Sequence, residues 1–157
     1  MRDLHNNLKA KMLLAPDTIT GDTDSASLDL LGYDSAELIV MFGDAANALS
    51  GSVYWTVAVE ESDDDSTFTA VTTATDLLFG ANPNVATPAA TTGVIATLDA
   101  DDDEDKLLRV GYVGSKRYIR ITLDETGDSG DADFRVIGLR GHPKDAPGLD
   151  VAAEINL

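Results

Sequence analysis

The amino-acid sequence predicts an all-β protein, an antiparallel β-sandwich or jelly roll. Short segments with strand-like apolar patterns recur along the chain, separated by clusters of Gly, Asn, Asp and Ser that favour turns. No segment after Pro16 has the apolar spacing of a long helix. Asp is also far more abundant than Glu, and Asp favours loops over helix interiors.

The N-terminal segment carries apolar side chains at Leu4, Leu8 and Met12, four residues apart. This spacing makes one stripe along a short helix, which Pro16 would end. We expect residues 1–16 to form an extended or short helical arm, with these three side chains as its contact to another surface. The alternative is that the stripe folds back onto the chain's own sandwich.

The predicted sandwich domain covers residues 17–143, beginning with a loop over residues 17–34 that contains short extended pieces. Six or seven strands follow, at residues 38–42, 52–60, 67–71, 94–98, 107–112, 117–123 and 134–139. Alternation within the strands predicts which side chains face the core. From Gly141 onward the chain reads as a tail, and residues 144–157 are assigned to it. The predicted core residues are Val53, Trp55, Val57, Val59, Leu108, Val110, Tyr112, Ile119, Ile121, Leu123, Phe134 and Val136.

Length and charge limit the classes of function. A chain of 157 residues is long enough for one domain with a sizeable core. Its formal net charge of −17 argues against nucleic acid and against an anionic membrane as partners. The absence of cysteine excludes disulfides, thiolate metal sites and a cysteine nucleophile. We therefore expect a soluble protein made in the cytoplasm.

Side chains suited to catalysis are few, and we expect no enzyme activity. His5 and His142 each lie near one end of the chain. Residues 127–130 spell Gly-Asp-Ser-Gly, as around a trypsin-like nucleophile, but Asp131 follows where that motif requires Gly. A polar turn is the better interpretation.

The acidic run at residues 99–105 suggests a calcium site as an alternative to a solvated loop. An EF-hand loop counted from Asp99 would need Gly at its sixth position and Glu at its twelfth, and these positions hold Glu104 and Val110. We expect neither a metal nor another cofactor. Trp55 is expected in the core, whereas Tyr54, on the opposite strand face, is the better candidate for stacking on a sugar.

Lys116, Arg117 and Arg120 form the most concentrated group of positive charges. In so acidic a chain they pair either with acidic residues of the same chain or with those of a neighbouring subunit. We favour pairing within the chain and keep a subunit contact through these three residues as a hypothesis, because arginine is enriched at interfaces.

Two blocks of the sequence, residues 53–71 (VYWTVAVEESDDDSTFTAV) and 111–121 (GYVGSKRYIRI), resemble small structural proteins of tailed bacteriophages, as do the DLHNNL and LDLLGYDSAELIV segments. The phage proteins that the sequence resembles look like capsid decoration, or cement, proteins. The resemblance implies a virion protein on the capsid exterior that binds the major capsid protein and itself, as a dimer or trimer.

The first two blocks are also similar to discoidin-like jelly rolls. That similarity implies, as an alternative, a carbohydrate-binding or host-adsorption module of the virion. A tail or head–tail joining protein is a further alternative.

Overall fold

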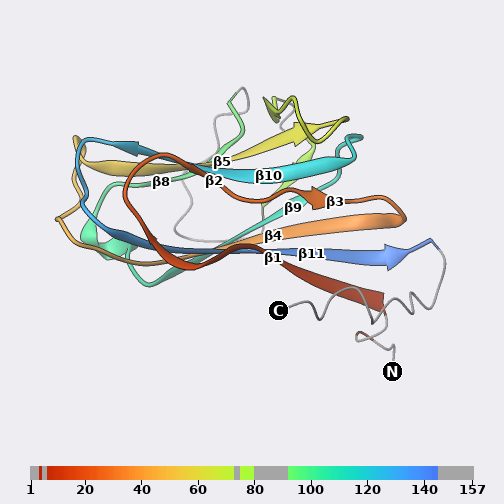
Figure 1. Ribbon diagram of the computed structural model, residues 1–157, viewed down its shortest axis with the longest axis horizontal. Coiled ribbons are helices and arrows are strands. Elements are labelled where there is room, and N and C mark those ends of the chain that lie inside the picture. The colour runs from red at the N-terminus through yellow and green to blue at the C-terminus, as the bar shows by residue number, and fades with distance from the viewer. Residues whose placement is uncertain (1–3, 5–6, 73–74, 80–91, 145–157) are drawn as a thin grey trace.

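The computed structural model describes residues 4, 7–72, 75–79 and 92–144, and strands dominate it (Figure 1). A turn of 3-10 helix, η2 (Asp101–Asp103), precedes β9. The strands are β1 (Leu8–Ile19), β2 (Thr23–Asp24), β3 (Leu28–Asp29), β4 (Tyr33–Ala45), β5 (Tyr54–Ser62), β6 (Thr69–Ala70), β7 (Leu77–Leu78), β8 (Val94–Leu98), β9 (Lys106–Tyr112), β10 (Tyr118–Thr126) and β11 (Ala132–Pro143).

The strands form two antiparallel sheets that pack face to face, as the two layers of Figure 1 show. Sheet A has the order β1-β11-β4-β9-β7. Sheet B is centred on β5 and β10, with β2 and β3 pairing to β10 and with β6 and β8 pairing to β5. The predicted antiparallel β-sandwich is confirmed.

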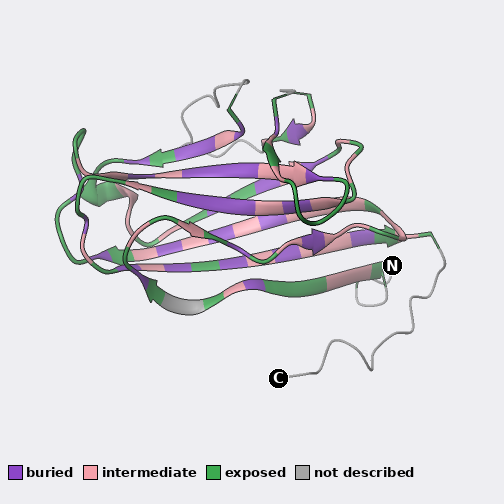
Figure 2. Cartoon of the chain, turned by 45° about the horizontal axis from the view of Figure 1, so that its top comes forward, coloured by how far each residue is buried: buried purple, intermediate pink, exposed green. Residues whose placement is uncertain are grey.

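The core lies between the sheets and is built from every second side chain of the long strands (Figure 2). The Phe134 ring stacks on Phe42, with centroids 4.8 Å apart, and meets Trp55 edge-on at 5.2 Å. Val53 is half-buried just before β5. The other predicted core residues are confirmed, because none is more than 2% exposed: Trp55, Val57, Val59, Leu108, Val110, Tyr112, Ile119, Ile121, Leu123, Phe134 and Val136.

The N-terminal segment is a strand from Leu8 onward, so the extended alternative for this segment is the one observed, and not the short helix. β1 pairs with β11 from Leu8↔Gly141 to Ile19↔Ala132, so the predicted arm boundary at residue 16 falls inside this strand. A spacing of four residues places side chains on one face of a strand as well as of a helix, so the pattern alone did not separate the two. Position 16 lies at a register shift in an edge strand, where a proline is tolerated.

Other predicted boundaries also change. β11 continues through Gly141 to Pro143, and the Lys144 N–H donates to the Gly32 carbonyl at 2.9 Å, so the predicted tail does not begin at Gly141. Residues 145–157 lie outside the described residues. The strand predicted at residues 67–71 is only two residues long, and the short strand β7 was not predicted.

Candidate functional site

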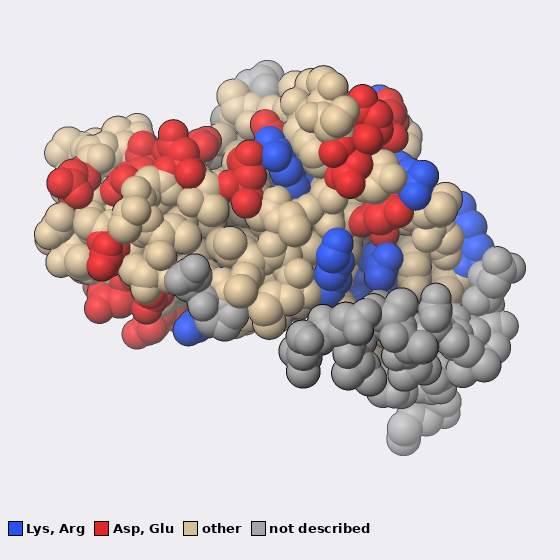
Figure 3. Space-filling view, in the orientation of Figure 1, with Lys and Arg blue, Asp and Glu red and all other residues tan. Residues whose placement is uncertain are grey.

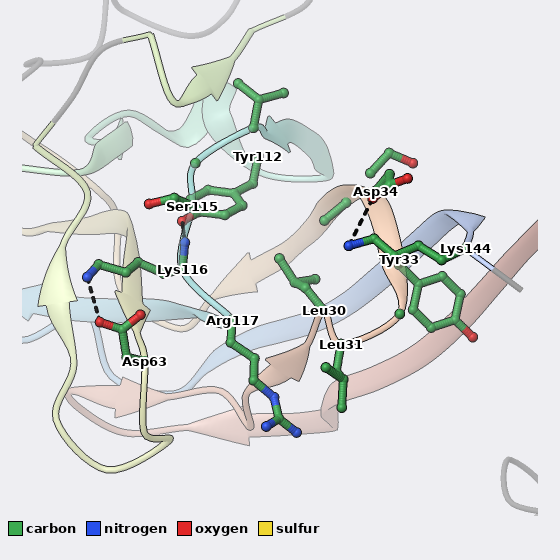
Figure 4. Close-up of a pocket in the computed structure, with 15 residues that line it drawn as sticks. Leu30, Leu31, Tyr33, Asp34, Asp63, Tyr112, Ser115, Lys116, Arg117 and Lys144 are labelled. Atoms are coloured by element: carbon green, nitrogen blue, oxygen red, sulfur yellow. Dashed lines mark hydrogen bonds and ion pairs between the residues drawn. The ribbon is translucent and has the colours of Figure 1, made fainter.

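A pocket of about 440 Å³ lies at one end of the sandwich (Figure 4). One side is formed by residues 30–36, which comprise the connection from β3 to β4 and the first residues of β4, and the other is the β9–β10 turn from Tyr112 to Arg117. Asp63 and Lys144 complete the lining. Its volume lies in the range of small-molecule sites, so the pocket is the candidate binding site.

The cations at the pocket are paired with acidic side chains of the same chain. Lys116 Nζ lies 2.6 Å from Asp63 Oδ2, and Lys144 Nζ lies 3.4 Å from Asp34 Oδ1 (Figure 4). The Asp63 carboxylate raises the pKa of Lys116 by hydrogen bonding to its ammonium group. The pocket therefore presents two ammonium groups, each beside a carboxylate, and its lining carries no unpaired lysine charge at these two positions.

Arg117 holds the pocket rim by a bidentate contact with Asp29. Its Nε and Nη2 donate to the two Asp29 oxygens at 2.9 and 2.8 Å. This contact lowers the pKa of Asp29 and raises that of Arg117. The Arg117 guanidinium also lies 4.8 Å from the centre of the Tyr118 ring. The pair connects the end of β3 to the start of β10.

Tyr112 forms the inner wall of the pocket. Its hydroxyl donates to Glu61 Oε2 at 2.6 Å and accepts from the Lys116 N–H at 3.0 Å. Burial, reinforced by the bond to Glu61, raises the pKa of Tyr112, so its phenol remains a fixed donor. A Cβ at Gly114 would lie 2.4 Å from the Tyr112 hydroxyl oxygen, so the turn needs glycine there.

Arg120 lies apart from the pocket, on the outer face of sheet B. It pairs with Glu60, directly opposite on β5, and with Asp24 of β2, and its guanidinium lies 4.3 Å from the centre of the Phe68 ring. The structure thus brings Lys116 and Arg117 to one site and places Arg120 at another. All three have partners within the chain, as the favoured interpretation expected, and their role as a subunit contact stays a hypothesis.

The three residues predicted as a contact to another protein lie at the β1 edge of sheet A. Leu4, just before β1, is 70% exposed and Met12 is 57% exposed. Leu8 is half-buried. Leu8 and Met12 point from the same face of β1, since they are an even number of residues apart. Leu8 and Met12 are thus presented together from a strand, and the role of the three residues as a contact to another protein stays a prediction.

Ser129, in the Gly-Asp-Ser-Gly segment, is fully buried and structural. Its Oγ accepts the indole N–H of Trp55 at 2.8 Å and donates to Glu125 Oε1 at 2.6 Å. The Ser129 N–H donates to the same Glu125 oxygen at 2.7 Å. The segment is a turn between β10 and β11, as the sequence interpretation favoured, and its hydroxyl anchors Trp55.

The acidic run from Asp99 to Asp105 accepts hydrogen bonds from backbone N–H groups, one of its own and two of the segment at residues 45–49. Asp101 accepts the Leu49 N–H at 2.9 Å, Asp103 accepts the Asp99 N–H at 3.1 Å, and Glu104 accepts the Ala45 N–H at 3.3 Å. Within the described ranges, no three His, Asp or Glu side chains lie close enough together to hold a metal ion. His142 is hydrogen bonded through Nδ1 to Ser35 Oγ at 2.9 Å, and His5 lies outside the described residues.

Charge is unevenly spread over the surface. On the face shown in Figure 3, acidic side chains gather over the left half and the top, and most Lys and Arg side chains lie toward the right. Among the residues that the structure describes, no helix has the length and apolar character needed to cross a membrane.

Comparisons with known proteins add little. No protein-family model and no curated protein matches the sequence. Among solved structures, the crystal structure of the infectious bursal disease virus VP2 subviral particle is similar over 90% of this chain, with 12% identity and a TM-score of 0.30. The match covers 31% of that viral chain, so this chain spans less than a third of its length. A similarity this low carries no argument about function.

Proposed function

We propose that this protein is a structural component of a tailed-bacteriophage virion that decorates the capsid exterior, without catalysis and without a cofactor. The resemblance of residues 53–71 and 111–121 to phage structural proteins supports this proposal, and the β-sandwich is compatible with it. The binding partners are the major capsid protein and further copies of the chain.

One observation carries the proposal: apolar side chains are exposed at the β1 edge, while Ser129 and Lys116 are held by hydrogen bonds or ion pairs within the fold. Leu4 and Met12 are 70% and 57% exposed, at the β1 edge of sheet A. Ser129 is buried, and Lys116 is paired. Such a surface suits docking on another protein, since buried apolar area drives association.

We assign the capsid contact to Leu4, Leu8 and Met12. The test is cosedimentation of the purified protein with undecorated capsids, comparing wild type with Leu4→Asp/Met12→Asp and with a chain that lacks residues 1–7. Deleting residues 1–14 is unsuitable, because it would remove half of β1. The control is Leu31→Asp, a matched charge at a 65% exposed leucine of the pocket rim.

Wild type and the Leu31→Asp variant are expected to saturate the capsids at the same copy number. The two N-terminal variants are expected to bind at least about 10-fold more weakly, as for loss of an apolar anchor, with unchanged melting temperatures. Capsid binding by both N-terminal variants at wild-type affinity would contradict the assignment. Absence of binding by the wild-type protein would contradict the proposed function itself.

A second candidate is carbohydrate binding in host adsorption, favoured by the pocket. Its volume of about 440 Å³ fits a small sugar, and its lining offers the hydroxyl of Ser115 and the paired groups Lys116–Asp63. Glycan-array binding that is lost in a Ser115→Trp variant, which fills the pocket, and retained in Leu4→Asp/Met12→Asp would favour this candidate.

A further inference from the structure

The outer faces of the two sheets differ sharply in chemistry. The outward positions of β5 and β10 in sheet B hold mainly polar side chains, among them Thr56, Glu60, Arg120 and Asp124. The corresponding face of sheet A carries six large apolar side chains, here called the sheet A patch: Met12, Ile39, Met41, Leu107, Ile137 and Leu139. The opposite faces of these strands already form the core.

Strand register places the six side chains next to one another. Met12 is opposite Ile137, and Ile137 is opposite Ile39, which makes one row across three strands. Met41, two residues along β4 from Ile39, is opposite Leu107. Leu139 lies two residues along β11 from Ile137. The patch therefore extends over four neighbouring strands, with Arg109 opposite Ile39 and Arg135 opposite Met41 on the same face.

The patch remains accessible to a partner. Met12 is 57% and Leu107 is 50% exposed, and the other four side chains are half-buried among their neighbours on the face. Large contiguous apolar surfaces are rare on monomers and mark interaction sites. A β-sheet with two apolar faces is typical of a sheet covered on both sides.

The charges within and beside the patch balance, although the chain carries −17. The charged residues at the outward positions of β4, β9 and β11 are Glu37, Arg109, Arg135 and Asp133, two of each sign. Glu37 and Arg109 pair with each other, and Asp133 accepts the Thr18 hydroxyl at 2.9 Å. Two strongly acidic molecules can meet through a locally neutral face without opposing like charges.

The size of the face matches that of a stable dimer interface. Four strands at about 4.8 Å spacing span about 19 Å, and the twelve residues of β1 or β11 span about 40 Å. Because β9 has only seven residues, the face covers roughly 690 Å², which approaches the ~800 Å² that each partner buries in a standard interface.

We propose that the sheet A patch is covered by the same patch of a second copy, so that two sandwiches pack sheet A against sheet A about a two-fold axis. Six apolar side chains from each copy interdigitate as in the core of a sandwich, at a sheet separation of about 10 Å. This proposal does not rest on the virion function.

Sedimentation equilibrium at micromolar concentration tests it. Wild type is expected at twice the 16.6 kDa of one chain. The Met41→Glu/Leu107→Glu variant is expected to be monomeric, with an association constant at least about 100-fold lower, because it buries two charges in the interface. The Thr97→Glu/Thr126→Glu control adds the same charge at exposed positions of sheet B and is expected to dimerise like wild type.

Melting temperatures show that the variants are folded. If Met41→Glu/Leu107→Glu does not fold, Leu107→Glu alone, at an exposed position, is expected to weaken dimerisation at least about 10-fold. A monomeric wild-type protein would overturn the proposal and leave the patch to a different protein. A folded Leu107→Glu or double variant that dimerises like wild type would overturn it as well. Met12 belongs both to the sheet A patch and to the proposed capsid contact. The chain that lacks residues 1–7 keeps Met12 and the rest of the patch, so it separates loss of capsid binding from loss of dimerisation.

Discussion

Replacing Ser129 by Ala tests the interpretation that this serine anchors the core and does not act as a nucleophile. The change removes the acceptor of the Trp55 indole N–H and one donor to Glu125, while the Ser129 N–H still donates to Glu125. Trp55 and Ser129 are both fully buried, so water does not replace the lost acceptor. An unsatisfied buried donor costs about 1–3 kcal/mol, and we expect a loss of about 2 kcal/mol in the free energy of unfolding.

Urea denaturation measures this loss directly. Trp55 is the only tryptophan of the chain, so its fluorescence follows the environment that the substitution changes. The expected decrease in melting temperature is about 4–8 °C for a domain of this size. Ser115→Ala, at an exposed serine, is the control and should change stability by less than about 0.5 kcal/mol. A loss below about 0.5 kcal/mol in Ser129→Ala would refute the reasoning.

Three further predictions concern the core, the pocket wall and the acidic run. Trp55→Ala is expected to cost about 3–5 kcal/mol in urea denaturation, and a loss under about 1 kcal/mol would contradict the core assignment. Because the pKa of Tyr112 is raised in the folded state, the unfolded chain releases this proton first. The difference in unfolding free energy between wild type and Tyr112→Phe should therefore be constant below pH ~10. Above pH ~10 it should decrease by at most about 1.4 kcal/mol per pH unit. A difference that stays constant up to pH ~11 would contradict this prediction. Chelator is expected to leave the melting temperature unchanged, whereas a decrease restored by calcium and not by magnesium would indicate an ion at residues 99–105.

The sequence was most informative where one strand face is polar and the other apolar. Alternation in β5 and β10 identified Trp55, Ile119 and Ile121 as core residues because the strand period is two. For β1 the sequence left a helix and an extended segment open, because a spacing of four residues fits both. The two-residue strands β2 and β3 exist only through hydrogen bonding to β10, which no local pattern records.

The partners of the positive side chains depend on long-range pairing. Arg117 binds Asp29, 88 residues away, and Lys116 binds Asp63, 53 residues away. Only the Arg120–Glu60 pair could be predicted, by aligning β5 with β10 as neighbours. The pocket is formed by two connecting segments brought together by the sheets, so its lining had no sequence signal.

The sheet A patch, by contrast, is indicated by the sequence itself, through strands that are apolar on both faces. Residues 38–42 form an uninterrupted apolar run, in which Leu38, Val40 and Phe42 enter the core and Ile39 and Met41 point outward. A strand that is apolar on both faces predicts that both faces are covered. The same holds for Ile137 in β11, which lies between the buried Val136 and Gly138.

Immunogold electron microscopy of purified phage particles that carry this protein tests the central claim most directly. With an antibody raised against the folded chain, the account predicts gold on the outside of the capsid, in many copies per particle, and none on the tail. Label confined to the tail or the head–tail junction, or particles that contain none of the protein, would contradict the assignment as a capsid decoration protein.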